Sequence, residues 1–191
     1  MRARIDRRSL ISDHALAQNQ AMHEAPEGFG GSGWKHAEAV VAFAEELGAA
    51  RLLDYGCGER TLRKQLKLME AGLKLAEYDP AVPKLAADPG PADLVVCTDV
   101  LEHVEPALLD NVLTHLRALS LDGCYLSIAT RPANKLLPDG RNAHLIVEDT
   151  PWWRARLTDP PLDWTIVREE DRRKEGGTKG HSYNVWLRSG R

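Results

Sequence analysis

The sequence has little cysteine, and its cysteines follow no pattern. Cys57, Cys97 and Cys124 are spread over 191 residues, and none forms a C-x-x-C pair. This spacing argues against a zinc cluster built on thiolates. We therefore expect reduced, mostly buried thiols in a reducing compartment, and we place the protein in the cytoplasm.

Long hydrophobic runs and a strong excess of one charge are also lacking. No stretch approaches membrane-spanning length, and the charged N-terminus has no apolar core of signal-peptide length, so we expect no membrane segment. A net charge of −3 does not imply broad electrostatic capture of nucleic acid, although a local basic patch would still allow it. Basic residues between the last two expected strands are either a solvated hairpin tip or phosphate contacts: Arg172, Arg173, Lys174, Lys179 and His181.

A glycine turn is the most informative stretch of the chain. The apolar run 51–53 reads as a buried strand, Asp54, Gly56 and Gly58 follow it, and a helical pattern covers 59–71. Such a turn lies at the carboxyl end of a parallel strand, where open α/β sheets bind ligands, although a plain strand-to-helix turn has the same pattern. No third glycine completes a dinucleotide fingerprint. The carboxylate before the first glycine favours a ligand that offers donors, such as an ammonium group.

A second acidic residue, Asp79, follows the alternating segment 73–78. It lies about twenty residues after the glycine turn, where nucleotide-binding α/β folds read ribose hydroxyls. The alternative is a turn-forming Asp-Pro pair. Together with Asp54 and the glycine turn, we favour ribose binding.

The remaining pattern predicts one α/β domain over residues 1–191. We expect helices at 10–23, 34–47, 59–71, from 107 to about 119, and from Thr150, with Thr150 as N-cap. We expect seven strands in a mostly parallel sheet with an antiparallel C-terminal hairpin and helices on both faces. They lie at 51–53, 73–78, 82–87, 93–98, within 121–129 after a loop with Gly123, and at 164–167 and 182–187. Residues 1–34 form an N-terminal helix and a glycine-rich segment, which is a linker or a lid over a pocket, and 35–191 form the core.

Three motifs resemble the class I S-adenosylmethionine-dependent methyltransferases. They are D-x-G-x-G at 54–58, the apolar strand 93–98 running into 99–104, and Asp122-Gly123 before a strand. The resemblance implies a Rossmann-like three-layer sandwich and S-adenosylmethionine as cofactor. It implies a cofactor site made by Asp54, Gly56, Cys57, Gly58, Asp79, Pro80, Thr98 and Asp99. Arg60 stands where the family often has a third glycine.

Asp99, Glu102 and His103 have a spacing that can point all three side chains to one side. With His144 in the next loop, they resemble the metal site of the small-RNA 3′-terminal 2′-O-methyltransferases. The first three also resemble that of the ubiquinone-pathway O-methyltransferases. The resemblance implies an Mg²⁺, Mn²⁺, Fe²⁺ or Zn²⁺ ion on these four residues. The alternative is that Asp99 contacts the cofactor while Glu102 and His103 are structural.

We therefore expect an O-methyltransferase acting on a small molecule, a nucleotide or an RNA end. Without a metal, His103 or His144 would be the general base. The loop 131–149 and the glycine-rich segment are candidates for closing the site. An N- or C-methyltransferase of a small metabolite and a non-catalytic cofactor-binding subunit remain as alternatives.

Overall fold

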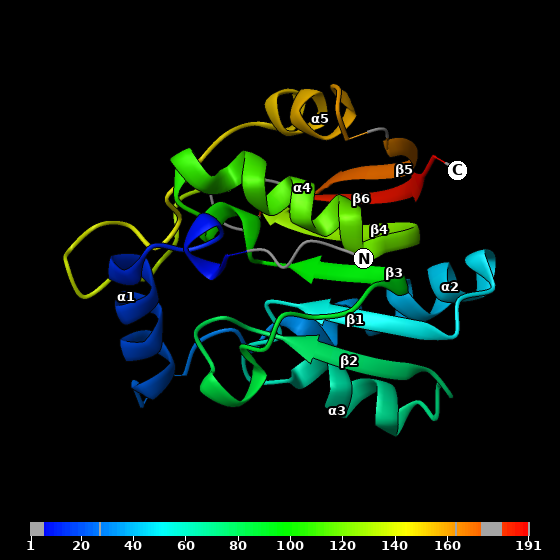
Figure 1. The fold of residues 1–191 in the computed structure, drawn as a ribbon, viewed down its shortest axis with the longest axis horizontal. Helices are drawn as coiled ribbons and strands as arrows, with labels where there is room; N and C mark the ends of the chain where they lie inside the picture. The colour runs from blue at the N-terminus through cyan, green and yellow to red at the C-terminus, as the bar shows by residue number, and fades with distance from the viewer. Residues whose placement is uncertain (1–5, 27, 163, 173–180, 191) are drawn as a thin grey trace.

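The computed structural model describes residues 6–26, 28–162, 164–172 and 181–190, and within them six strands form one sheet. The strand order is β2-β1-β3-β4-β6-β5 (Figure 1). The strands are β1 Arg51–Tyr55, β2 Lys74–Tyr78, β3 Ala92–Thr98, β4 Ser120–Ala129, β5 Trp164–Arg172 and β6 Ser182–Ser189. Strands β1 to β4 pair in parallel, and β6 is antiparallel to both β4 and β5. The mostly parallel sheet and its antiparallel C-terminal hairpin are thus confirmed.

The prediction of a seventh strand at 82–87 is wrong. This segment contains the short 3₁₀ helix η3, Pro83–Leu85. Pro83 has no N–H to give to a strand ladder, and the Leu85 N–H donates to the Val82 carbonyl in a local turn.

Helices cover both faces of the sheet, as the three-layer prediction requires. Helices α2, Ala37–Leu47, and α3, Thr61–Leu68, pack on one face through a core that includes Leu52, Leu94 and Val96. Helices α4, Leu109–Leu119, and α5, Thr150–Thr158, pack on the other through Leu53, Val95 and Cys97. Residues 94–98 of β3 are buried because both faces of this strand are covered.

The structure corrects several predicted helix ends. The first helix, α1, is Asp13–Glu24 and begins late because the Ser12 hydroxyl caps it, accepting from the Ala15 N–H. Residues Gly33–His36 form the 3₁₀ helix η2 before α2. The N-cap of α5 is Asp149 and not Thr150, since the Asp149 carboxylate accepts from the Trp152 N–H. Further 3₁₀ turns are η1 Arg7–Ser9, η4 Leu101–His103 and η5 Pro106–Leu108.

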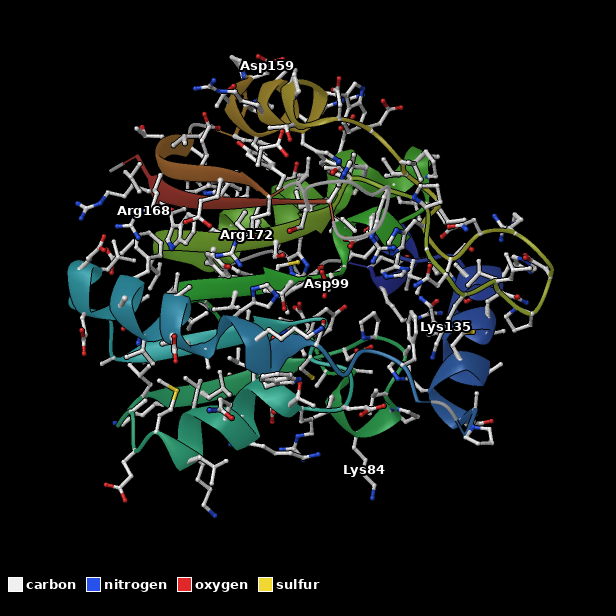
Figure 2. All side chains as sticks on the ribbon, turned by 180° about the vertical axis from the view of Figure 1, so that it is seen from behind. Lys84, Asp99, Lys135, Asp159, Arg168 and Arg172 are labelled. Carbon is white, nitrogen blue, oxygen red and sulfur yellow. The ribbon has the colours of Figure 1, made fainter. Side chains whose placement is uncertain are left out.

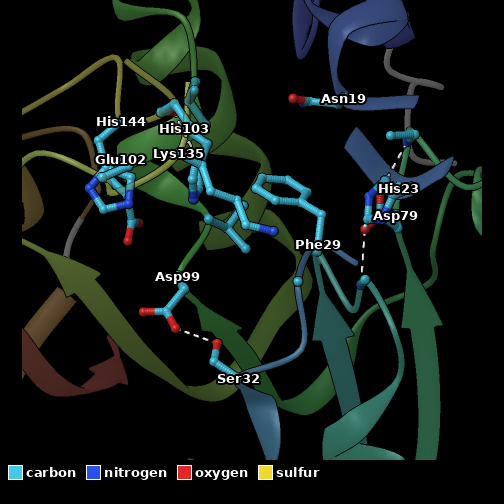
Figure 3. Close-up of a pocket in the computed structure, with 18 of the residues that line it drawn as sticks. Asn19, His23, Phe29, Ser32, Asp79, Asp99, Glu102, His103, Lys135 and His144 are labelled. Carbon is cyan, nitrogen blue, oxygen red and sulfur yellow. Dashed lines mark hydrogen bonds and ion pairs between the residues drawn. The ribbon is translucent and has the colours of Figure 1, made fainter. Parts of the chain in front are cut away.

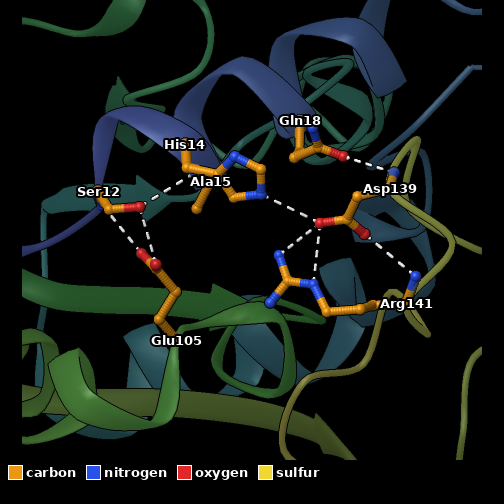
Figure 4. A network of polar contacts seen from close by, with 7 residues as sticks. All are labelled: Ser12, His14, Ala15, Gln18, Glu105, Asp139 and Arg141. Carbon is orange, nitrogen blue, oxygen red and sulfur yellow. Dashed lines mark hydrogen bonds and ion pairs between the residues drawn. The ribbon is translucent and has the colours of Figure 1, made fainter.

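Helix α1 lies at the carboxyl ends of the strands, beside the loop 131–149 (Figure 1). A polar network holds it there (Figure 4). The Ser12 hydroxyl donates to Glu105, and Asp139 of the loop binds both His14 at 3.1 Å and Arg141 at 2.7 Å. These contacts fix one wall of the space above the sheet.

No helix among the described residues is long and apolar enough to cross a lipid bilayer. Of the basic cluster at 172–181, residues 173–180 lie outside the described part of the chain, and Arg172 pairs with Glu170.

Candidate active site

A cavity of about 550 Å³ opens at the carboxyl ends of the parallel strands. Its size is in the usual range for small-molecule sites. Its lining comes from α1, the glycine-rich segment, the turns after β1, β2, β3 and β4, and the loop that carries His144 (Figure 3). Of the predicted cofactor residues, it is lined by Gly56, Gly58, Asp79, Pro80 and Asp99.

The glycine turn after β1 has a backbone that only glycine adopts easily. Gly56 and Gly58 have φ values of 80° and 47°, and a Cβ on Gly56 would clash with Val100. The N–H groups of Gly56 and Cys57 both donate to the Tyr78 carbonyl, which ties the turn to β2. The turn thus presents bare backbone to the cavity.

Asp79 joins the turn after β2 to the glycine turn. Its two carboxylate oxygens accept from the N–H groups of Gly58, at 3.0 Å, and of Ala81, at 2.9 Å. His23 of α1 lies 3.9 Å from the same carboxylate. A carboxylate oxygen accepts more than one hydrogen bond, so Asp79 keeps acceptor capacity at the cavity wall.

Three predicted cofactor residues, Asp54, Cys57 and Thr98, are buried and are not among the side chains that line the cavity. Burial raises the pKa of Asp54 to about 7, and the neighbouring carboxylates of Glu77 and Asp79 add to this shift. Arg60 adopts a left-handed conformation with φ 62°, and its guanidinium pairs with Glu77 at 2.6 Å. Arg60 therefore fits the place of a third glycine.

Residues 28–33, called here the cap segment, lie directly over the glycine turn. Gly30 and Gly58 meet backbone to backbone: a Cβ on Gly58 would lie 2.7 Å from the Gly30 carbonyl oxygen. The Ser32 hydroxyl donates to Asp99, and Lys135 Nζ donates to the Gly28 carbonyl at 2.5 Å (Figure 3). The cap segment is thus held at both ends and covers the cavity as a lid does.

Phe29 of the cap segment points into the cavity between two histidines. Its ring packs edge-on against His23 at 5.4 Å and against His103 at 5.2 Å between centroids. Phe29 therefore separates the end of the cavity near Asp79 from the end near His103 (Figure 3).

Glu102, His103 and His144 converge at this second end. Each offers a ligand atom, and these atoms lie within 4.8 Å of one another. The predicted fourth ligand, Asp99, is not in this group. Asp99 has φ 54°, and its carboxylate accepts from Ser32 instead.

Both histidines turn the same nitrogen toward the backbone. Nδ1 of His103 lies 2.7 Å from the Ala143 carbonyl oxygen, and Nδ1 of His144 lies 2.6 Å from that of Arg131. Because a carbonyl only accepts, Nδ1 carries the proton and Nε2 keeps a free lone pair. Burial lowers the pKa of His103 to about 4 and also lowers that of His144, which keeps both rings neutral.

Glu102 is fully buried beside the two rings. One carboxylate oxygen accepts from the Ala129 N–H at 2.9 Å, and the other has no hydrogen-bond partner. Burial, together with the charge of Asp99, raises the pKa of Glu102 to about 8. An unpaired buried oxygen and two free imidazole lone pairs fit a divalent cation.

The sequence pattern did not single out Ser32, Arg131 or Lys135 at this site. No local motif marks them, because Ser32 meets Asp99 across 67 positions of the chain and Lys135 meets Gly28 across 107. The glycine-rich segment was the only signal available for the cap.

A family model described as a methyltransferase domain matches residues 30–164. A comparison with curated proteins found no match.

Several solved structures have the same fold. Magnesium protoporphyrin IX methyltransferase from Synechocystis PCC 6803, with bound SAM, is 18% identical, with a TM-score of 0.61 over 100% of both chains. The 1,6-didemethyltoxoflavin-N1-methyltransferase from Burkholderia thailandensis is 15% identical, with a TM-score of 0.65 over 99% of this chain and 93% of that one. The methyltransferase domain of bacterial CtHen1-C is 14% identical, with a TM-score of 0.61 over 83% and 98%.

Proposed function

Since the chain belongs to the methyltransferase-domain family and is an S-adenosylmethionine-dependent methyltransferase, we propose that it methylates a hydroxyl oxygen with the help of a divalent cation. The cation would be held by Glu102, His103 and His144. The acceptor would be a small molecule or the sugar of a nucleotide or RNA end.

The observation that carries this proposal is the orientation of the three side chains. Backbone carbonyls fix both histidines with Nε2 free, and the unpaired oxygen of Glu102 lies beside them. In metal sites, the second imidazole nitrogen is typically oriented by such a partner. If Glu102 were only structural, its second carboxylate oxygen would stay buried without a hydrogen-bond partner, which is energetically costly.

The cofactor fits the other end of the cavity. The glycine turn offers backbone without a Cβ, and Asp79 offers acceptors for ribose hydroxyls. Bound there, S-adenosylmethionine supplies an electrophilic methyl group. The chain's own part is to align the acceptor oxygen with that methyl group and to exclude water, which the cap segment and Phe29 favour by covering the cavity.

Glu102, His103 and His144 are called here the Glu102 cluster. A cation held by this cluster would lower the pKa of a bound hydroxyl. Glu102 and the two histidines would hold that cation and thereby fix the position of the hydroxyl. If no cation binds, neutral His103 or His144 at the cavity wall can accept the hydroxyl proton, because the free Nε2 of each ring is a base.

Metal binding by the dialysed protein, loaded with S-adenosylhomocysteine, tests the proposal. We expect about one Mn²⁺ per chain in electron paramagnetic resonance titrations, and Glu102→Gln should weaken binding at least about tenfold. Exposed Glu38→Gln on α2 serves as the matched control and should bind Mn²⁺ as the wild type does.

Methyl transfer from labelled S-adenosylmethionine to a panel of acceptors completes the test. Fragmentation of the labelled product places the methyl on oxygen, nitrogen or carbon. A nitrogen or carbon product would replace the O-methyltransferase proposal, and no binding of Mn²⁺, Mg²⁺, Fe²⁺ or Zn²⁺ would remove its metal.

A further inference from the structure

Two cationic side chains, Arg131 and Lys135, line the cavity. Arg131 follows β4, and its carbonyl is the group that orients His144. Lys135 reaches over the cavity toward the cap segment (Figure 3). Figure 2 shows Lys135 on the side of the molecule where β3 ends at Asp99.

Neither cation has a carboxylate partner among the residues that the structure describes. Among the described residues, the Arg131 side chain makes one hydrogen bond, from Nη1 to the adjacent Pro132 carbonyl, and Lys135 donates to the neutral carbonyl of Gly28. The Nε atom of Arg131 is buried and has no partner. A buried donor left unpaired is costly and points to a group that would satisfy it.

Two other acidic side chains of the cavity wall are hydrogen-bonded elsewhere: Asp79 accepts from two backbone N–H groups, and Glu105 accepts from Ser12. Glu59 lies against Gly28, the residue to whose carbonyl Lys135 donates. Asp99 and Glu102 would balance the two charges of a divalent ion. Within the described part of the chain, the charge of Arg131 is then left without a carboxylate partner, whereas Glu59 lies near Lys135.

We propose that Arg131, assisted by Lys135, binds an anionic group of the acceptor, a phosphate or a carboxylate. This inference rests on the proposed function, because it places the anionic group on the molecule whose hydroxyl is methylated. The Nε atom of Arg131 has no partner in the described part of the chain, and the Nε–Nη2 edge of a guanidinium matches the two oxygens of a phosphate or carboxylate. Since Arg131 and His144 both line the cavity and are joined through the Arg131 carbonyl, the anionic group would lie on the same side of the cavity as the methylated hydroxyl.

The test measures how two simple anions bind to the full chain loaded with S-adenosylhomocysteine. Sodium phosphate and sodium acetate are titrated at constant ionic strength against a sodium chloride baseline and followed by calorimetry. We expect saturable binding of at least one anion, and Arg131→Gln should weaken it at least tenfold. Arg131→Lys keeps the charge but loses the planar edge, so its affinity for the anion should lie between that of the wild type and that of Arg131→Gln.

Arg188→Gln is the matched control, because Arg188 is an exposed residue of β6 outside the cavity lining. It should bind both anions as the wild type does, and every variant should keep the wild-type affinity for S-adenosylhomocysteine. Tighter phosphate binding identifies a phosphorylated acceptor, and tighter acetate binding identifies a carboxylate. Absence of saturable binding to the wild type, or equal binding to Arg131→Gln, would overturn the proposal.

Titrations with and without Mn²⁺ separate this inference from the proposed function. If Mn²⁺ does not bind but phosphate or acetate still needs Arg131, the metal-assisted function fails and the anion site stands. If Mn²⁺ binds and neither anion does, the anion site fails alone.

Discussion

At the scale of single residues, the environment of Asp54 differs most from the one that the sequence pattern predicted. The pattern suggested a carboxylate facing a cationic ligand, but Asp54 is 3% exposed and is not among the side chains that line the cavity. Its register partner on β2, Glu77, brings a second carboxylate next to it. Burial and like charge therefore favour the protonated form of Asp54.

This protonation makes the stability of the protein depend on pH. Because the folded-state pKa of Asp54, about 7, lies above the ordinary value of 3.8, the contribution of Asp54 to stability is present at low pH. It is lost as the pH rises through 7. We expect the wild type to lose roughly 2 kcal/mol of unfolding free energy between pH 5 and pH 8 relative to Asp54→Asn.

Urea unfolding of both proteins at the two pH values gives this difference. Exposed Glu38→Gln should show the wild-type dependence on pH. Identical pH slopes for the wild type and Asp54→Asn would mean that Asp54 is ionised in the fold.

At the scale of elements, the sequence predicted well which segments are helices and which are strands, but it predicted poorly where they begin and end. Apolar spacing located the helices and all six observed strands, since burial on one or two faces leaves a clear period. The false strand at 82–87 contains Pro83, whose effect on a strand depends on whether that strand lies at an edge. Strand β5 extends to Arg172 although its second half is charged, because pairing with β6 supplies the ladder.

The convergence of the site residues was only partly predictable. Glu102 and His103 are adjacent in the chain, and the resemblance to known metal sites added His144. The orientation of Asp99 depends on a left-handed backbone and on Ser32 of the distant cap segment. Local pattern contains no information on such a contact.

The crossing of the cap segment over the glycine turn gives an element-scale prediction. Gly30→Ala places a Cβ at 3.0 Å from Gly58 Cα, in a backbone with φ 80°. Gly72→Ala has a similar φ of 65° but open space around the new methyl group. Both variants should lose about 1 kcal/mol of unfolding free energy to the left-handed backbone.

Only Gly30→Ala should also weaken S-adenosylhomocysteine binding, by several-fold, because the cap segment must move away from Gly58. Calorimetry of the two variants makes the comparison. Equal affinities would show that the crossing does not shape the cofactor site.

At the scale of the whole molecule, the topology separates the two ends of the cavity. From β1 the chain passes to β2 on one side, and then crosses back to β3 on the other. Ligands bind at such a switch point in open α/β sheets. The glycine turn and Asp79 come from β1 and β2, whereas the Glu102 cluster comes from the segments after β3 and β4.

This separation predicts that cofactor and metal stabilise the protein independently. S-adenosylhomocysteine at about 100 times its dissociation constant should add about 2.7 kcal/mol, a rise in melting temperature of roughly 5–10 °C. A Mn²⁺ ion should give its own rise, and the two should add.

The variants Asp79→Ala and His144→Ala should dissect these two rises. Asp79→Ala should weaken S-adenosylhomocysteine binding by about 1–3 kcal/mol, because it removes the proposed acceptors for ribose hydroxyls, and should leave the Mn²⁺ rise intact. His144→Ala removes one of the three proposed metal ligands, and should abolish the Mn²⁺ rise while changing cofactor affinity by only about a few tenths of a kcal/mol. Thermal unfolding with each ligand alone and with both measures all four effects. Phe29 contacts both His23, which lies beside Asp79, and His103, which lies beside His144. Loss of both rises in melting temperature in either variant would therefore mean that the two ends of the cavity form one coupled site.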